Sequence, residues 1–78
     1  MNIFVGNLSD KTTSGHLSHL FIQFGKVLSV KIIRDSLTGR SLGYGFVEMD
    51  NRSGAMAIQQ LDRMNFMNHY MEITEAGI

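Results

Sequence analysis

Two stretches of the chain alternate residue by residue, as half-buried strands do, because successive side chains leave a pleated backbone on opposite faces. The residues of Leu42 to Met49 divide into Gly43, Gly45, Val47 and Met49 on one face and Tyr44, Phe46 and Glu48 on the other. In the stretch from Asn2 to Leu8, Ile3 and Val5 alternate with Phe4 and Gly6. If the aliphatic residues face a core, Phe4, Tyr44 and Phe46 face solvent. We call these three rings the aromatic platform.

Helical spacing of apolar residues follows each of these strands. Between the first strand and Gly25 the apolar residues are Leu17, Leu20, Phe21 and Phe24, which is the i, i+3, i+4, i+7 pattern of one helix face. We expect Thr12 or Thr13 to cap this helix and Gly25 to end it. A second helix is predicted from Ser53 to Asp62, where Gly54, Ala57, Ile58 and Leu61 share a face.

Two further strands complete the prediction. From Val27 to Asp35, we expect Leu28, Val30 and Ile32 to point inward, and Lys31 and Ile33 to lie outward beside the aromatic platform. From Tyr70 to Thr74, Met71 and Ile73 are predicted inward, and Glu72 and Thr74 outward. The segment 63–69 between the second helix and the last strand is expected to be irregular, with Phe66 packed under it. Met49, Met64 and Met71 fit core positions.

The chain also resembles a known family. Ile-Phe-Val-Gly-Asn-Leu at Ile3 to Leu8 is similar to the shorter signature of the RNA recognition motif, and Leu42 to Met49 is similar to the longer one. The resemblance covers Asn2 to Ala76, so we expect one such domain over residues 1–78. The start at Met1, directly on the first strand, is similar to small single-domain bacterial RNA-binding proteins.

The predicted element order is strand, helix, strand, strand, helix, strand. This order is typical of the α+β, ferredoxin-like βαββαβ sandwich, in which a four-stranded antiparallel sheet has both helices on one face. Its first and third strands are central neighbours, so the aromatic platform is expected on the open face. Resemblance to the family implies that Phe4 and Tyr44 each lie beneath one base and Phe46 against the sugars between them.

The charges modify this hypothesis. Seven Lys and Arg balance seven Asp and Glu, so the chain lacks the basic surplus that is common in nucleic-acid-binding proteins. Leu42 stands where the longer signature begins with Lys or Arg, and the outward Glu72 adds a negative charge. Arg34 and Arg40, in the predicted loop around Gly39, are the candidates for phosphate contacts. We expect weak binding of single-stranded RNA with low sequence specificity, and single-stranded DNA is a second candidate ligand.

Other functions are less well matched by the residues. The chain has no cysteine, and no apolar run approaches the roughly 20 residues of a membrane span, so we expect a cytoplasmic protein without disulfides. His16 and His19 lack a third ligand in register, so neither a metal nor another cofactor is expected. An enzyme of the acylphosphatase type would need an arginine in the loop after the first strand, and Gly6 to Lys11 contains none. We therefore do not expect an enzyme.

The alternative is a domain of the same family that binds a protein partner through the exposed platform and Ile33. The sequence pattern indicates no particular oligomeric state. Binding to short RNA distinguishes the two hypotheses, since only the first needs all three rings at the base-stacking positions.

Overall fold

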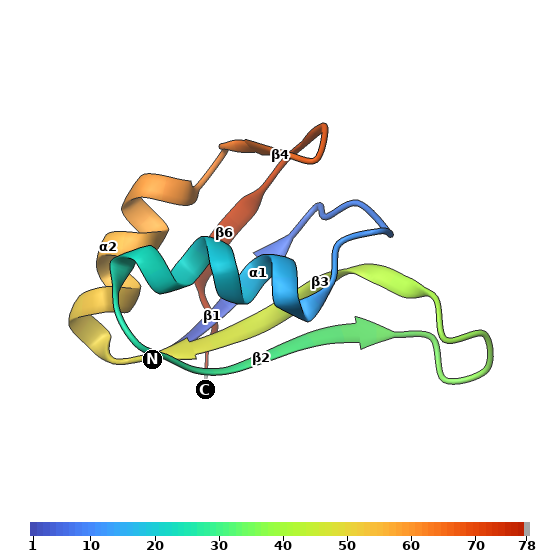
Figure 1. The fold of residues 1–78 in the computed structure, drawn as a ribbon, viewed down its shortest axis with the longest axis horizontal. Coiled ribbons are helices and arrows are strands. Elements are labelled where there is room, and N and C mark those ends of the chain that lie inside the picture. The colour runs from blue at the N-terminus through green and yellow to red at the C-terminus, as the bar shows by residue number, and fades with distance from the viewer. Residues whose placement is uncertain (78) are drawn as a thin grey trace.

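The computed structural model describes residues 1–77 and shows an antiparallel sheet with two helices on one face (Figure 1). The sheet has the strand order β2-β3-β1-β6, and a two-stranded hairpin of β4 and β5 lies before β6. The elements are β1 (Asn2–Gly6), α1 (Ser14–Phe21), the 3-10 turn η1 (Ile22–Phe24), β2 (Val27–Arg34), β3 (Ser41–Met49), α2 (Asn51–Leu61), β4 (Asn65–Phe66), β5 (His69–Tyr70) and β6 (Glu72–Glu75). The predicted ferredoxin-like arrangement is confirmed.

The pairing of the central strands decides which residues share a face. On β1 and β3, Phe4 is paired with Phe46 and Ile3 with Val47, so aromatic residues face one another on one side and aliphatic residues on the other. Ile3, Val5, Val47 and Met49 are buried completely beneath the helices. Because one side of the sheet forms the core, a one-residue slip would expose this whole set, and the hydrophobic pattern therefore fixes the register.

A capping box begins α1. The Thr13 hydroxyl accepts a hydrogen bond from the His16 backbone N–H at 3.1 Å, and His16 Nδ1 accepts one from the Thr13 N–H at 3.0 Å. Thr13 is therefore the cap, while Thr12 is buried and its hydroxyl donates to Met67 Sδ at 3.4 Å. The helix tightens into η1 and ends at Gly25, whose φ of 152° favours glycine.

Helix α2 begins earlier than predicted, because Asp50 provides its cap. The Asp50 carboxylate accepts from the Ser53 N–H and hydroxyl, each at 2.9 Å, so the helix runs Asn51–Leu61 rather than from Ser53 to Asp62. These hydrogen bonds from Ser53 hold the pKa of Asp50 below its ordinary value. Gly54 lies under Met1, since a Cβ there would come within 2.5 Å of the Met1 sulfur.

Two core predictions are wrong. Leu28 was expected inward but is 55% exposed, because β2 carries a bulge: Val27 pairs with Met49 and Ser29 with Glu48, which leaves Leu28 as the extra residue. Met64 was placed in the core and is 49% exposed. It follows α2 in the connection to β4, where helical spacing no longer applies.

The C-terminal region also differs from the prediction. The segment expected to be irregular contains the β4–β5 hairpin, and Tyr70 belongs to β5 rather than to the last strand of the sheet, which is Glu72–Glu75. Met67 and Asn68 both have positive φ, 53° and 66°, as in a two-residue type I′ turn. Phe66 packs against the core, as expected.

Candidate functional site

The three rings of the aromatic platform are neighbours on the open face of the sheet. The Phe4 centroid lies 5.8 Å from that of Tyr44 and 5.9 Å from that of Phe46, and the centroids of Tyr44 and Phe46 are 6.2 Å apart. All three side chains are half-buried. The Phe4 and Tyr44 planes differ by 33°, whereas Phe46 stands at 66° and 87° to them. The platform is therefore two similarly tilted rings with a third on edge.

Phe4 lies back along its own strand because Gly6 has no side chain. A Cβ built on Gly6 would lie 2.6 Å and 2.7 Å from Cε2 and Cζ of the Phe4 ring, which is closer than real Cβ atoms approach. The ring covers Gly6, which is buried. Glycine at this position thus allows the ring to lie low over the strand and present a face to a stacking ligand.

Neighbouring strands place the other predicted residues in two rows across the face. In one row, Lys31 on β2 pairs with Phe46, Phe46 with Phe4, and Phe4 with Thr74 on β6. Further along, Gly6 pairs with Glu72, while Ile33 on β2 lies where the β2–β3 register shifts, between the pairs Ile32–Gly45 and Arg34–Ser41. The β2 side of the platform therefore carries Lys31, and the β6 side carries Glu72. Glu48, which shares its face of β3 with Phe46, is also exposed, so the open face carries a cation on β2 and carboxylates on β3 and β6.

The β2–β3 hairpin carries the two predicted arginines, and it projects beyond the rest of the molecule at the right of Figure 1. Arg34 ends β2 and its guanidinium donates to the Gly39 carbonyl at 3.2 Å, while Arg40 immediately precedes β3. Both side chains are exposed. The structure thus separates the arginines from the platform residues and gathers them at the end of the hairpin.

Asp35 shapes the turn of this hairpin. Its carboxylate accepts from the Leu37 and Thr38 backbone N–H groups at 2.8 Å and 2.9 Å. The hydrogen bonds from Thr38 and Leu37 hold the pKa of Asp35 below its ordinary value. Leu37 at the turn is 94% exposed. The turn is therefore an ordered structure held by Asp35, with an apolar side chain at its tip.

Leu42 precedes an irregularity in β3. Gly43 has a φ of 83°, and its carbonyl accepts from the Leu8 N–H at 2.8 Å, which carries the β1–β3 pairing past the end of β1. Leu42, where the family signature has a basic residue, is 52% exposed. This position presents an apolar surface rather than a charge.

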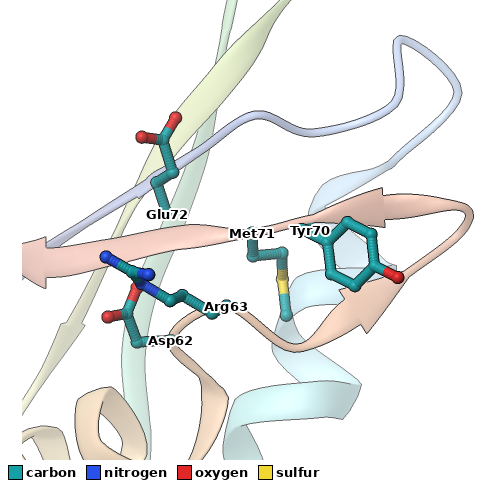
Figure 2. Close-up of a pocket in the computed structure, with 5 residues that line it drawn as sticks. All are labelled: Asp62, Arg63, Tyr70, Met71 and Glu72. Carbon is teal, nitrogen blue, oxygen red and sulfur yellow. The ribbon is translucent and has the colours of Figure 1, made fainter.

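Sequence reasoning missed a hollow at the outer edge of β6. It has a volume of about 420 Å³ and is lined by Asp62, Arg63, Tyr70, Met71 and Glu72 (Figure 2). In Figure 2, Glu72 and Asp62 lie on opposite sides of the β6 ribbon, with the Tyr70 ring further along. Tyr70 was predicted within the last strand, and the alternation with inward Met71 was the one signal that its 65% exposed ring faces outward.

Hydrogen bonds to backbone groups fix the segments that line the hollow. The Asp62 carboxylate accepts from the Ile73 N–H at 2.9 Å, and the Arg63 N–H donates to the Met71 carbonyl at 2.8 Å. Asn7 Nδ2 donates to the Tyr70 carbonyl at 2.7 Å, which ties the hairpin to the loop after β1. Arg63 has a φ of 67°, the left-handed conformation that non-glycine residues adopt uncommonly.

His16 has a structural role in α1. His16 is occupied in the capping box of α1. Within residues 1–77 there is no group of three or more His, Cys, Asp or Glu side chains placed to hold a metal ion. No helix in the same range has the length and apolar character needed to cross a membrane.

Comparison with known proteins agrees with this geometry. The family model described as the RNA recognition motif matches residues 3–72. The chain belongs to the RNA recognition motif family. Among curated relatives, the putative RNA-binding protein RbpE of Nostoc sp. is 39% identical over 77 residues, which cover 97% of this chain and 78% of the relative.

Solved structures of an RNA-binding protein and of a protein–RNA complex superpose closely on this chain. The crystal structure of RNA binding protein PG1 has a TM-score of 0.95 at 42% identity, covering 97% of this chain and 93% of that one. A Sex-lethal protein–RNA complex has a TM-score of 0.93 at 29% identity, covering 99% of this chain and 47% of that one. The structural relatives thus include a protein whose structure was determined with RNA bound.

Proposed function

We propose that this RNA recognition motif binds single-stranded RNA by stacking bases on the aromatic platform. The observation that carries the proposal is the cluster of three neighbouring rings, with centroids 5.8 to 6.2 Å apart, on the sheet face that no helix covers. The exposed parts of these rings gain by leaving water, and base stacking on a side-chain ring contributes about 1 to 3 kcal/mol per base. The whole chain acts as one binding domain, without catalysis.

The two similarly tilted rings, Phe4 and Tyr44, each take one base, and Phe46, standing on edge, contacts the sugars between them. The 33° angle between Phe4 and Tyr44 supports this division, since successive bases of one strand need faces of similar orientation. Two or three such contacts, reduced by the entropy of ordering the strand, predict a dissociation constant in the micromolar range. This corresponds to a binding free energy of about −8 kcal/mol.

Charged residues act at the margins of this site. Lys31 lies one strand beyond Phe46, and Arg34 and Arg40 lie at the β2–β3 hairpin. We propose that these three cations contact phosphates and that Ile33 packs against the adjoining base or sugar. The small number of cations accounts for our expectation of a low salt dependence. Thr74 and Glu72 complete the face on the opposite edge.

A titration of the labelled protein with short single-stranded RNA, followed by amide chemical shifts, tests the proposal. Shifts should concentrate on β1 and β3, at Phe4, Tyr44 and Phe46, and extend to Lys31 and Thr74. Shifts confined to α1 and α2 would contradict it. The same titration with single-stranded DNA of equal length tests the second candidate ligand. We also propose that the protein is located in the cytoplasm, which fluorescence imaging of the tagged protein tests.

A further inference from the structure

Glu72 occupies a position from which it can read the edge of a bound base. Phe4 lies back over Gly6, and Gly6 is the strand partner of Glu72. Side chains of directly paired residues have Cβ atoms about 4.5 to 5.5 Å apart. The outer end of the Phe4 ring therefore lies beside the root of the Glu72 side chain, which is exposed.

The surroundings of Phe4 favour a stacked base whose hydrogen-bonding edge points towards β6. Towards β3, the Phe4 ring is flanked by Tyr44 and Phe46, at 5.8 Å and 5.9 Å. A base lying on Phe4 gains nothing by directing its hydrogen-bonding groups over these apolar rings, because unpaired polar groups pay for lost hydration. Towards β6 it meets polar side chains: Thr74, the partner of Phe4, and Glu72.

The edge beyond Glu72 is open. The hollow of about 420 Å³ along β6 includes Glu72 in its lining, together with Tyr70 and Arg63 (Figure 2). A base is wider than a phenyl ring, so one stacked on Phe4 extends past the strand. Within residues 1–77, β6 is the last strand on this side of the sheet, so a base edge that projects past Phe4 meets Glu72 rather than a further strand.

We propose that Glu72 selects, at the Phe4 position, a base that offers amino-group donors on its pairing edge, guanine above all. A carboxylate accepts hydrogen bonds and donates none. Guanine presents two adjacent donors, N1–H and the N2 amino group, which match the two carboxylate oxygens. Adenine and cytosine each present one amino group, and uracil presents a single N3–H donor between two carbonyl oxygens, which face the carboxylate unfavourably. This selection rests on the proposed stacking function and assigns a base class to the same site.

The Glu72 proposal also gives the negative charge of this face a function. Glu72 stands on the opposite side of the platform from Lys31, with two strands between them. On the β2 side, Lys31 attracts phosphates, and the Glu48 carboxylate of the same face accepts a hydrogen bond from the Ser29 hydroxyl at 3.2 Å. Glu72 disfavours phosphates on the β6 side, so a bound strand is expected to hold its backbone towards Lys31 and to direct the base on Phe4 towards β6. The charge distribution and the donor pattern then favour one orientation of that base.

The experiment compares fluorescein-labelled UUUUU, UUGUU and UUIUU, where I is inosine, by fluorescence anisotropy. Inosine keeps N1–H and lacks the N2 amino group. We expect UUGUU to bind about tenfold more tightly than UUUUU, with UUIUU between them, since one good base contact discriminates by about 1 to 3 kcal/mol. Glu72→Gln should reduce the preference for UUGUU to about twofold or less.

Glu75→Gln is the matched control. It removes the same charge from the same strand, but Glu75 pairs with Ile3, whose side chain is in the core, so the alternation turns it away from the open face. This variant should change binding of all three RNAs by one common factor and keep their ratios. Urea unfolding of both variants checks that the fold is retained.

The possible results separate this inference from the proposed function. If the wild type binds UUUUU as tightly as UUGUU while Phe4→Ala weakens both, stacking stands and selection by Glu72 is wrong. A preference for UUGUU that survives in Glu72→Gln would also overturn it, because another group would then read the base. Absence of binding to all three RNAs would overturn both proposals.

Discussion

The aromatic platform and the tip of the β2–β3 hairpin both carry residues proposed to contact RNA, but they are held in different ways. Phe4 and Phe46 are directly paired across two central strands whose other face is the hydrophobic core. Arg34 and Arg40 lie at an exposed hairpin end, held by a turn in which Asp35 accepts two backbone hydrogen bonds. The rings are thus positioned by the whole fold, and the arginines by a few local contacts.

This difference assigns different energetic roles to the two regions. A ring fixed beforehand by a rigid sheet loses little entropy when a base stacks on it. An exposed arginine must give up side-chain freedom, and salt screens its attraction to phosphate. The platform should therefore supply most of the affinity, and the hairpin should mainly set its salt dependence.

The largest expected effect comes from removing two rings together. Phe4→Ala with Tyr44→Ala should weaken binding of short single-stranded RNA at least thirtyfold, because each lost stacking contact costs about 1 to 3 kcal/mol. Affinity is measured by fluorescence anisotropy, with circular dichroism to check the fold. Tyr70→Ala removes a more exposed ring outside the platform and should change affinity less than threefold. Undiminished binding by the double variant would contradict stacking on the platform.

A smaller effect is expected when the Phe4 ring is displaced rather than removed. Gly6→Ala adds a Cβ where Cε2 and Cζ of Phe4 now lie, so the ring must rotate away from its position over the strand. RNA affinity should fall about fivefold to tenfold, as part of one stacking contact is lost. Nuclear Overhauser contacts between the Phe4 ring and residue 6 report the displacement.

Gly15→Ala is the control for this substitution. The space around Gly15, at the start of α1, is open apart from Thr13 Oγ1 at 3.6 Å. Alanine should raise the free energy of unfolding by roughly 0.5 kcal/mol through helix propensity and leave RNA binding unchanged. Equal losses of affinity in the two variants would mean that the position of the Phe4 ring does not matter.

The hairpin arginines should affect the salt dependence more than the affinity. Each phosphate neutralised on a single strand contributes about −0.7 to the slope of log K against log salt concentration. Arg34→Gln with Arg40→Gln should make the slope shallower by up to about 1.4, and should weaken UUGUU and UUUUU by the same factor. An unchanged slope in a salt titration would show that the hairpin lies outside the RNA path.

The smallest effect concerns stability at low pH. Hydrogen bonds from Ser53 lower the pKa of Asp50 in the folded state, so Asp50 stabilises the fold above the unfolded-state pKa of about 3.9. This stabilisation is lost as the pH falls through the lower folded value. Asp50→Asn, which keeps a capping oxygen but does not titrate, should therefore show a smaller drop in the urea midpoint between about pH 6 and about pH 2.

Asp10→Asn is the comparison for Asp50, since Asp10 is an exposed carboxylate that caps no helix. This variant removes a surface carboxylate without altering a helix cap, so it reports how much the loss of any such carboxylate changes the urea midpoint. An acid dependence of Asp50→Asn equal to the wild type would mean that the cap does not contribute through its charge.

Much of the fold was predictable because it depends on local patterns. Alternation identified the four strands of the sheet and the faces of Phe4, Tyr44 and Phe46, while apolar spacing identified both helices. Errors arose where a partner strand or a cap decides the outcome. Leu28 follows the alternation, yet the bulge opposite Met49 and Glu48 turns it outward. The start of α2 depends on the Asp50 carboxylate, which the apolar spacing does not register.

The sequence alone determined the candidate site residues and the side of a strand on which they lie, because backbone geometry gives each strand residue a face irrespective of the rest of the protein. Only the tertiary structure decided which of those residues are neighbours. The pairing of Gly6 with Glu72, the Phe4 ring lying over Gly6, and the hollow between Arg63 and Tyr70 join segments far apart in the chain. Such contacts follow from register and packing, which no single segment specifies.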